Sequence, residues 1–330
     1  MIVTPEQQQS SALQTPLTAV QWLAQWHSDG VQLGLAELTY YQAKLPLLRR
    51  SRRARRKLPQ GALLSPHKGR GMEFDEVRQY QAGDDVRAID WRVTARTGTP
   101  HTKLYREEQE RPVWLLVDLA PSMYFGSELL FKSVQAAHTA AALAWLAMSR
   151  GDRVGAMLSN GFEHQEFKPQ ARHANIMRIL QQLVQVHNQG LQHWQRQAGS
   201  ADGLRQNLAR LRTLLKPGSE VYLISDYQRL DESLLRELRA LEQHARVTHL
   251  LIYDQFEQTL PTQLTSKMKL QGANRQAVVD FSSPEHHQRY RQQQQRYWQA
   301  LTDTFSAHQL HWRTINAGMA LEQQWQDLGL

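Results

Sequence analysis

Two aspartates in this sequence follow strongly apolar segments and could bind one cation together. Asp118 follows the run from Val113 to Val117, and Asp226 ends the run that starts at Val221. Ser122 lies four residues after Asp118, in a tight loop where side chains at alternate positions can converge. Ligands bind beyond the carboxyl ends of parallel strands. Because carboxylate and hydroxyl oxygens suit hard cations, Asp118, Ser122 and Asp226 are the candidate ligands of Mg²⁺ or Mn²⁺.

Each of these residues also has a purely structural interpretation. Asp118 could accept hydrogen bonds from amides of its own loop. Ser122 could be the N-cap of the helix that follows. Asp226 could brace the next turn through the backbone. The sequence leaves both interpretations open.

The segments that must position these residues alternate between strands and helices. Continuous apolar runs predict buried parallel strands, and apolar residues at helical spacing predict the helices between them. The strands are predicted at 113–118, 153–159, 221–226, 247–253 and 310–314, with a further run at 276–281. The helices are predicted at 128–149, 172–187, 204–215, 230–243, 284–305 and the C-terminus. Asn160-Gly161 predicts a two-residue turn to an antiparallel strand at 162–167. This order predicts an α/β fold with helices on both faces of the sheet.

Three segments are expected along the chain. Residues 1–60 predict one or two amphipathic helices followed by a basic run. Residues 61–111, rich in glycine and paired charges, predict short strands and ordered loops. In this segment Trp91 is predicted to fill a core position, and an ion-pair network is predicted for the charged residues Asp84, Asp85, Arg87, Asp90, Arg92 and Arg96. A partner-binding face is the alternative. Residues 112–330 form the predicted α/β domain.

Charge and composition exclude several classes of protein. The net charge is +8, but the stretch from Arg49 to Gly71 holds nine Lys and Arg and no acid, so the rest nets −1. This basic stretch could bind an acidic protein or nucleic acid, or be a solvated connector. The absence of cysteine excludes thiol nucleophiles and cysteine-bound metals. No P-loop motif is present. No segment predicts a membrane span, and a cytoplasmic location is expected.

Five motifs in order give the chain a family resemblance. They are GRGMEFD (69–75), RQYQAGDDVRAIDWRVTAR (78–96), VDLAPSM (117–123), GDRVG (151–155) and ISD (224–226). The set resembles the domain-of-unknown-function family 58 over residues 60–316. Asp118-x-Ala-x-Ser122 before a long helix also resembles the metal-ion-dependent adhesion site of von Willebrand factor A domains. The resemblance implies a Rossmann-like von Willebrand factor A-type sheet behind a small family-specific segment.

The resemblance also implies a metal site, but with ligands missing. Asp118 matches the first aspartate, Ser122 the second serine and Asp226 the distal aspartate. Ala120 stands where the first serine is expected, and the loop 168–175, where a threonine is expected, holds no hydroxyl residue. A weakened or absent metal site follows.

The function expected from this resemblance is non-enzymatic. Family members are associated with MoxR-type AAA+ ATPases and are thought to be adaptors or assembly factors. We expect the Asp118/Ser122/Asp226 face to dock an acidic side chain of a partner, with or without a divalent metal. The alternatives are a metal-dependent hydrolase at the same residues and nucleic-acid binding through residues 49–71. We expect no nucleic-acid partner, because aromatic residues are not interleaved with the basic run.

Overall fold

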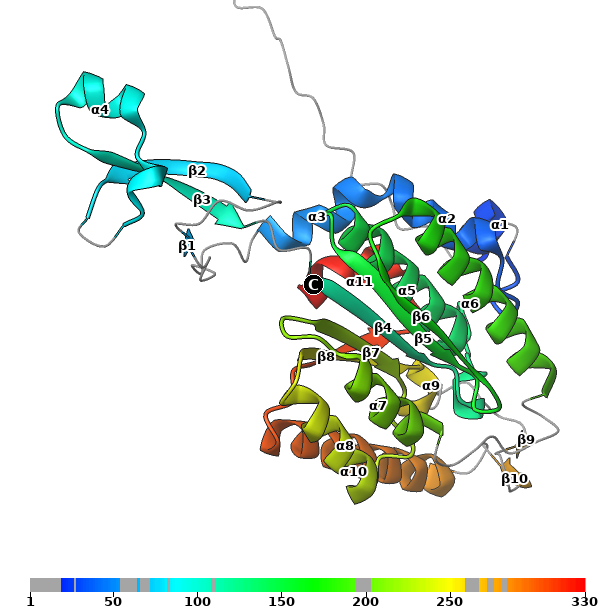
Figure 1. The fold of residues 1–330 in the computed structure, drawn as a ribbon. Helices are drawn as coiled ribbons and strands as arrows, with labels where there is room; N and C mark the ends of the chain where they lie inside the picture. Colours follow the sequence, from blue (N-terminus) through cyan, green and yellow to red (C-terminus); the bar gives the residue numbers. More distant parts are fainter. Residues whose placement is uncertain are drawn as a thin grey trace, which may run out of the picture.

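The structure is a computed structural model that describes residues 19–26, 28–53, 64–65, 72–81, 84–107, 111–193, 203–258, 267–271, 276–280 and 284–329. Its centre is a sheet of six strands in the order β11-β8-β7-β4-β5-β6 (Figure 1). These strands are β4 (Pro112–Asp118), β5 (Arg153–Ser159), β6 (His164–Gln170), β7 (Glu220–Ser225), β8 (Arg246–Tyr253) and β11 (Trp312–Asn316). Only β5 and β6 pair antiparallel. The predicted α/β architecture with a mostly parallel sheet is confirmed.

The turn between β5 and β6 differs from the prediction. Residues 160–163 connect the two strands, and the Asn160 amide donates to the Glu163 carbonyl at 3.3 Å. The side-chain oxygen of Asn160 accepts from the amides of Phe162 and Glu163. Asn160 therefore organises a longer loop than the two-residue turn its sequence predicts, although the antiparallel return is correct.

Both faces of the sheet are buried, which explains the continuous apolar runs. On β4, Val113, Leu115 and Val117 belong to one core cluster, and Trp114 and Leu116 belong to the other. Figure 1 shows α5 (Lys132–Met148) and α6 (His173–His193) on one face of the sheet. The other face is covered by α7 (Gly203–Leu214), α8 (Glu232–Glu242) and α10 (Pro284–Ala307).

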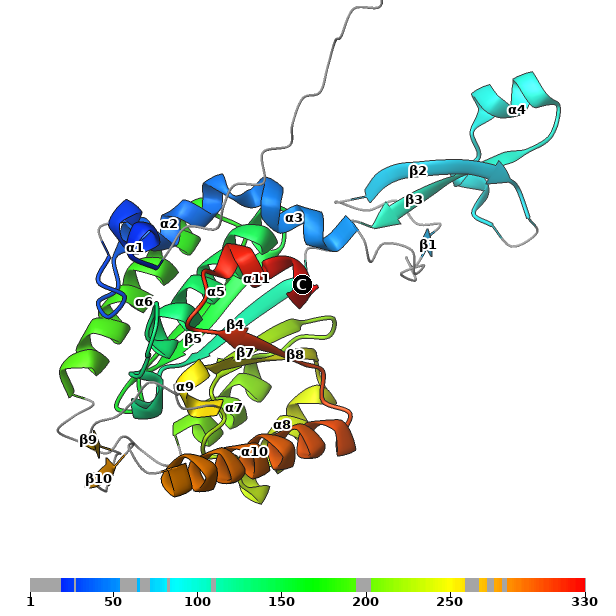
Figure 2. The same cartoon turned by 180° about the vertical axis from the view of Figure 1, so that it is seen from behind.

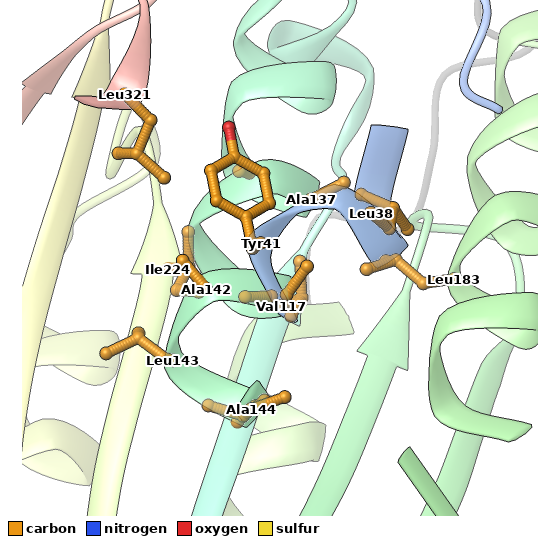
Figure 3. Packing of buried hydrophobic residues seen from close by; sticks show 14 of the residues in the cluster. Leu38, Tyr41, Val117, Ala137, Ala142, Leu143, Ala144, Leu183, Ile224 and Leu321 are labelled. Carbon is orange, nitrogen blue, oxygen red and sulfur yellow. The ribbon is translucent and has the colours of Figure 1, made fainter. Parts of the chain in front are cut away.

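Three N-terminal helices extend the first core cluster. They are α1 (Ala19–Trp26), α2 (Leu35–Ala43) and α3 (Leu45–Arg53), where one or two helices were predicted. Figure 3 shows Leu38 and Tyr41 of α2 beside Ala137 of α5 and Leu183 of α6. The Trp145 indole donates to the Leu38 carbonyl at 3.0 Å, and the Tyr41 hydroxyl lies 3.0 Å from His138 Nδ1. The N-terminal helices are thus tied to α5 by both packing and buried polar bonds.

The remaining elements of the α/β body are short. They are the 3-10 turn η2 (Pro121–Met123), α9 (Gln255–Gln258) and α11 (Leu321–Leu328). The predicted strand at 276–281 is present as β10 (Gln276–Asp280). It pairs antiparallel with β9 (Lys267–Gln271) in a separate two-stranded sheet.

Residues 72–107 form a projecting arm. Its antiparallel strands are β2 (Met72–Gln79) and β3 (His101–Glu107), and β1 (Leu64–Ser65) pairs with β3. Between β2 and β3 lie the 3-10 turn η1 (Val86–Ala88) and the helix α4 (Trp91–Thr97). Figures 1 and 2 both show the arm standing away from the α/β body, on the side where β4 begins.

Most of the basic stretch lies outside the described residues. Residues 54–63 and 66–71 are not described, so the predicted role of the stretch stays a prediction. Arg49, at its start, is described and donates to the Ser149 carbonyl at 3.1 Å. Within the described part of the chain, no helix has the length and apolar character needed to cross a membrane.

We predict that Leu38→Ala destabilises the whole α/β body. Leu38 is fully buried against the first core cluster, so truncation leaves a cavity and should cost about 2–5 kcal/mol of unfolding free energy. Urea denaturation followed by far-UV circular dichroism should show one shifted transition, while Gln42→Ala, on the exposed side of α2, should change little. A separate early transition, or no shift, would mean that α2 is not part of this core.

Candidate functional site

The candidate site lies where β4 and β7 end side by side. The chain leaves β4 for β5 on one side and returns to β7 on the other, so the crossovers diverge between β4 and β7. Such a divergence opens a crevice beyond the strand ends, which is where α/β sheets bind ligands. Asp118, Ser122 and Asp226 all line one cavity of about 40 Å³ here. The structure therefore brings the three predicted residues together.

Asp118 is almost completely buried in this cavity. It is 6% exposed, and its carboxylate accepts hydrogen bonds from the Ser225 hydroxyl at 2.8 Å and from the Ala120 amide. Burial raises the pKa of Asp118 to about 7, the hydrogen bond from Ser225 opposes the rise, and the charge of Asp226 adds to it. Burial thus favours the protonated form of Asp118 over a wider pH range than for an exposed carboxyl group.

Asp226 is held by a buried lysine. Lys132, at the start of α5, is 0% exposed, and its ammonium lies 2.8 Å from Asp226 Oδ2 and 2.6 Å from Glu257 Oε1. Burial alone lowers the pKa of Lys132, but the two carboxylates outweigh it, so the net shift is upward and the lysine stays charged. For Glu257, burial raises the pKa and Lys132 partly offsets the rise. One internal cation therefore serves two carboxylates.

A third strand-end acid ties the neighbouring loop to β8. Asp254 directly follows β8 and is fully buried. It accepts hydrogen bonds from the Ser127 amide at 2.9 Å and the Ser127 hydroxyl at 2.5 Å. Asp254, Glu257 and Lys132 are not among the site residues predicted from the sequence. Asp254 shows the same signal as Asp118 and Asp226, an acid after an apolar run, but the partners of Lys132 are remote in sequence.

The structural interpretations of the three residues have different outcomes. Asp118 does bond a loop amide, through Ala120, and Asp226 does brace its turn, because the Gln228 amide donates to Asp226 Oδ1 at 3.2 Å. Ser122 is not the N-cap of α5, because that position is Phe131. Ser122 lies in η2, half-buried at the cavity wall.

The side chains around the cavity fit a divalent metal poorly. In the described ranges, no group of three His, Asp or Glu side chains is arranged to hold a metal ion. Ala120 offers no hydroxyl, and the ammonium of Lys132 already bonds one oxygen of Asp226. The occupancy of this site by Mg²⁺ or Mn²⁺ stays a prediction.

Residues 76–300 match the family described as "Protein of unknown function DUF58", and the chain belongs to that family. Relatives in Mycobacterium bovis and in two strains of Mycobacterium tuberculosis, each described as an uncharacterized protein, are 44% identical over 93 residues. That stretch is 28% of this chain and 29% of the length of those relatives. The chain therefore matches under a third of each relative.

Two solved structures show distant likeness. The conserved hypothetical protein BatB from Bacteroides thetaiotaomicron aligns with 66% of this chain and 98% of its own, at 12% identity and a TM-score of 0.40. An uncharacterized membrane spanning protein from Vibrio fischeri aligns with 65% of this chain and 94% of its own, at 15% identity and a TM-score of 0.21. The fold is therefore assigned from the strand order and the helices of this chain, and not from these two structures.

We predict that Lys132→Met strongly destabilises the protein. The change leaves Asp226 and Glu257 buried without a cation, which should cost about 3–5 kcal/mol of unfolding free energy. Chemical denaturation would measure the loss, and Lys216→Met, at an exposed lysine, is the matched control. Adding Asp226→Asn to Lys132→Met should restore part of the stability. An unchanged midpoint for Lys132→Met alone would mean that the ion pair contributes nothing.

We predict that Asp118→Asn changes how stability depends on pH. Between the ordinary carboxyl pKa of 3.8 and about 7, the unfolded chain has lost this proton while folded Asp118 retains it. The free energy of unfolding of the wild type therefore falls as pH rises, by about 4 kcal/mol from this group. Asparagine removes that slope, so the variant should match the wild type near pH 4 and exceed it near pH 8.

The measurement is the difference in unfolding free energy between variant and wild type at a series of pH values. Asp327→Asn, at an exposed aspartate of α11, should give a difference that does not vary with pH. A flat difference for Asp118→Asn as well would show that Asp118 titrates like an exposed carboxyl group.

Proposed function

We propose that this chain is a non-enzymatic adaptor or assembly factor that binds a MoxR-type AAA+ ATPase in the cytoplasm. In this proposal the cavity face, the surface around Asp118, Ser122 and Asp226, contacts a partner protein. Its position at the divergence of β4 and β7 supports this role, because loops there form binding sites without disturbing the core. The choice of ATPase comes from the resemblance of the motifs.

A von Willebrand factor A-type domain is part of the same proposal. Numbered along the chain, the six strands have the spatial order 3-2-1-4-5-6, with the third strand antiparallel at one edge. This order is that of doubly wound nucleotide-binding sheets. Together with Asp118-x-Ala-x-Ser122 after the first strand, it supports the assignment.

The observation that carries the binding role is that the two aspartates already have partners inside the chain. Asp226 is held by Lys132, and Asp118 accepts from Ser225. A general base must reach a substrate proton, and a metal ligand must offer its oxygen to the ion. Here both carboxylates line a small cavity and already bond groups within the chain, which favours a docking role.

The same bonds favour docking without a metal. The ammonium of Lys132 supplies positive charge beside Asp226, where an adhesion-type site would place a divalent ion. Arg205 and Arg229 line the cavity together with Asp118, Asp226 and Asp231, so an acidic side chain of a partner would bind toward the two arginines. Partner binding then depends on salt concentration and not on a divalent ion at this site.

A metal-dependent hydrolase at the same residues is the second candidate, and the burial of Asp118 favours it. A pKa of about 7 for Asp118 is what a general acid or base needs at neutral pH. Turnover by the isolated chain that disappears in Asp118→Asn would establish this alternative.

We predict that a bulky residue at Ser122 weakens binding to the purified MoxR-type ATPase of the same organism. Ser122→Tyr should fill the cavity mouth and reduce affinity about tenfold or more, as occluding a central contact does. Thr213→Tyr, exposed at the far end of α7, should bind like the wild type. Biolayer interferometry in the apo, ADP and ATP-analogue states measures both.

Failure of the wild type to bind in every nucleotide state would refute the partnership. Equal binding by Ser122→Tyr would move the contact away from the cavity face. Calorimetry of the isolated chain with millimolar MgCl₂ or MnCl₂ is expected to show no heat. Heat that Asp226→Asn abolishes would replace metal-free docking with metal-dependent docking.

A further inference from the structure

The end of the arm, residues 84–100, exposes large apolar side chains. Trp91 is 67% exposed and Val86 is 58% exposed, the two highest values among the large hydrophobic residues that the structure describes. The prediction that Trp91 fills a core position is wrong. Trp91 is the first residue of α4. The helix contacts β3 through Thr94 and not through Trp91.

The helix α4 has a clear division between an inner and an outer side. On the inner side, the Thr94 hydroxyl accepts from the His101 amide of β3 at 3.1 Å, and Val93 is half-buried. Trp91, Arg92, Ala95 and Arg96 are all exposed. Positions four apart share one face of a helix, so Trp91 and Ala95 form one row and Arg92 and Arg96 the next.

The aspartates of this segment bond other groups within the arm. Asp84 pairs with Arg78 at 2.7 Å and accepts from the Gln81 amide. Asp85 accepts from the Arg87 amide at the start of η1. Asp90 caps α4 through the amides of Arg92 and Val93 and pairs with Lys103 at 3.4 Å. Backbone hydrogen bonds are the main cause that lowers the pKa of both Asp84 and Asp90.

The arginines of the same segment do not pair with its aspartates. The predicted ion-pair network joins the acids to Arg78 and Lys103, and not to Arg87, Arg92 or Arg96 as expected. Those three side chains are exposed, and none bonds another side chain among the described residues. The outer surface of the arm end therefore combines a tryptophan, a valine and three arginines without an ion-pair partner in the described part of the chain, while Asp85 is half-buried and bonds the Arg87 amide.

We propose that this outer surface, Val86, Arg87, Trp91, Arg92 and Arg96, is a docking surface for an acidic face of a partner protein. Trp91 inserts into an apolar pocket of the partner, and carboxylates around that pocket pair with the three arginines. Tryptophan and arginine are the residues that most often dominate protein interfaces. The partner is the MoxR-type ATPase, and this identification rests on the proposed function.

Charge and position choose this occupant over others. A second copy of the chain is disfavoured, since each copy would bring the same positive charges to the contact. A nucleic acid would bind through the arginines but would leave Val86 without a partner. The arm lies on the side of the body where β4 begins (Figure 2), and the cavity face lies where β4 ends, at Asp118. Variants of one surface therefore leave the other intact.

The first experiment compares binding of full-length variants to the purified MoxR-type ATPase by biolayer interferometry. Trp91→Ala should reduce affinity about tenfold or more. The triple variant Arg87→Gln, Arg92→Gln, Arg96→Gln should do the same and lose most of its salt dependence. The matched control is Arg172→Gln, Arg236→Gln, Arg239→Gln, which removes three exposed arginines from the body. Wild-type affinity for both arm variants would overturn the proposal.

A second experiment decides the matter if the wild type does not bind the ATPase. A photo-crosslinking amino acid replaces Trp91 in the native host, and the crosslinked peptides are identified by mass spectrometry. The expected product joins position 91 to an apolar pocket bordered by Asp and Glu on another protein, and the triple arginine variant should abolish it. The same probe at Thr213 is the control.

The two experiments separate the two proposals. A crosslink to an acidic protein other than the ATPase would support the docking surface and refute the ATPase partnership. No specific crosslink, or crosslinks only to nucleic acid or to a second copy of this chain, would overturn the docking surface itself.

Discussion

The buried ammonium of Lys132 fixes the arrangement on which the rest of the structure depends. It joins α5 to Asp226 beyond β7 and to Glu257 of α9 beyond β8, with no access to water. An unpaired charge at this depth would be very unfavourable, so the three groups must come together for the fold to be stable. The α5 helix in turn contacts most of the sheet and the N-terminal helices. The position of the lysine therefore sets the position of the central helix over the strand ends.

This constraint also determines what the cavity can do. With its cation committed to Asp226 and Glu257, the site leaves Asp118 as a buried carboxyl whose main partner is the neutral hydroxyl of Ser225. The pKa of Asp118 is raised, because burial disfavours the charged form of its carboxyl group. The cavity lining also holds charges of both signs, with Asp118, Asp226 and Asp231 beside Arg205 and Arg229. The bonds of Asp118 to Ser225 and of Asp226 to Lys132 are what supports the proposed docking role.

The sequence was most informative where structure depends on local patterns. The run from Val113 to Asp118 predicted β4 because both of its faces are buried, and the predicted strand ends placed Asp118 and Asp226 together. It was least informative where structure depends on contacts between distant residues. The pairing of Lys132 with Glu257 joins positions 125 residues apart, and nothing near either one signals it. Trp91 was misassigned because large aromatic residues are usually buried, and only the fold shows that α4 packs through other residues.

The strand ends and the arm end differ in which side chains already have partners within the chain. At the strand ends, the acids are satisfied by Lys132 and Ser225, so the polar groups there are already organised before any partner arrives. At the arm end, Asp84 and Asp90 are satisfied by Arg78 and Lys103, and the groups left over are Trp91 and the arginines beside it. In the segment 84–96, Asp84 and Asp90 therefore bond groups within the arm, whereas Trp91 and the arginines beside it lie exposed on the surface. An exposed tryptophan gains more from burial against a partner than any polar surface residue does, because burying apolar area is the main favourable term in association. If both proposals hold, the arm end would therefore contribute most of the binding energy, and the cavity face at the opposite end of β4 would select which partner fits.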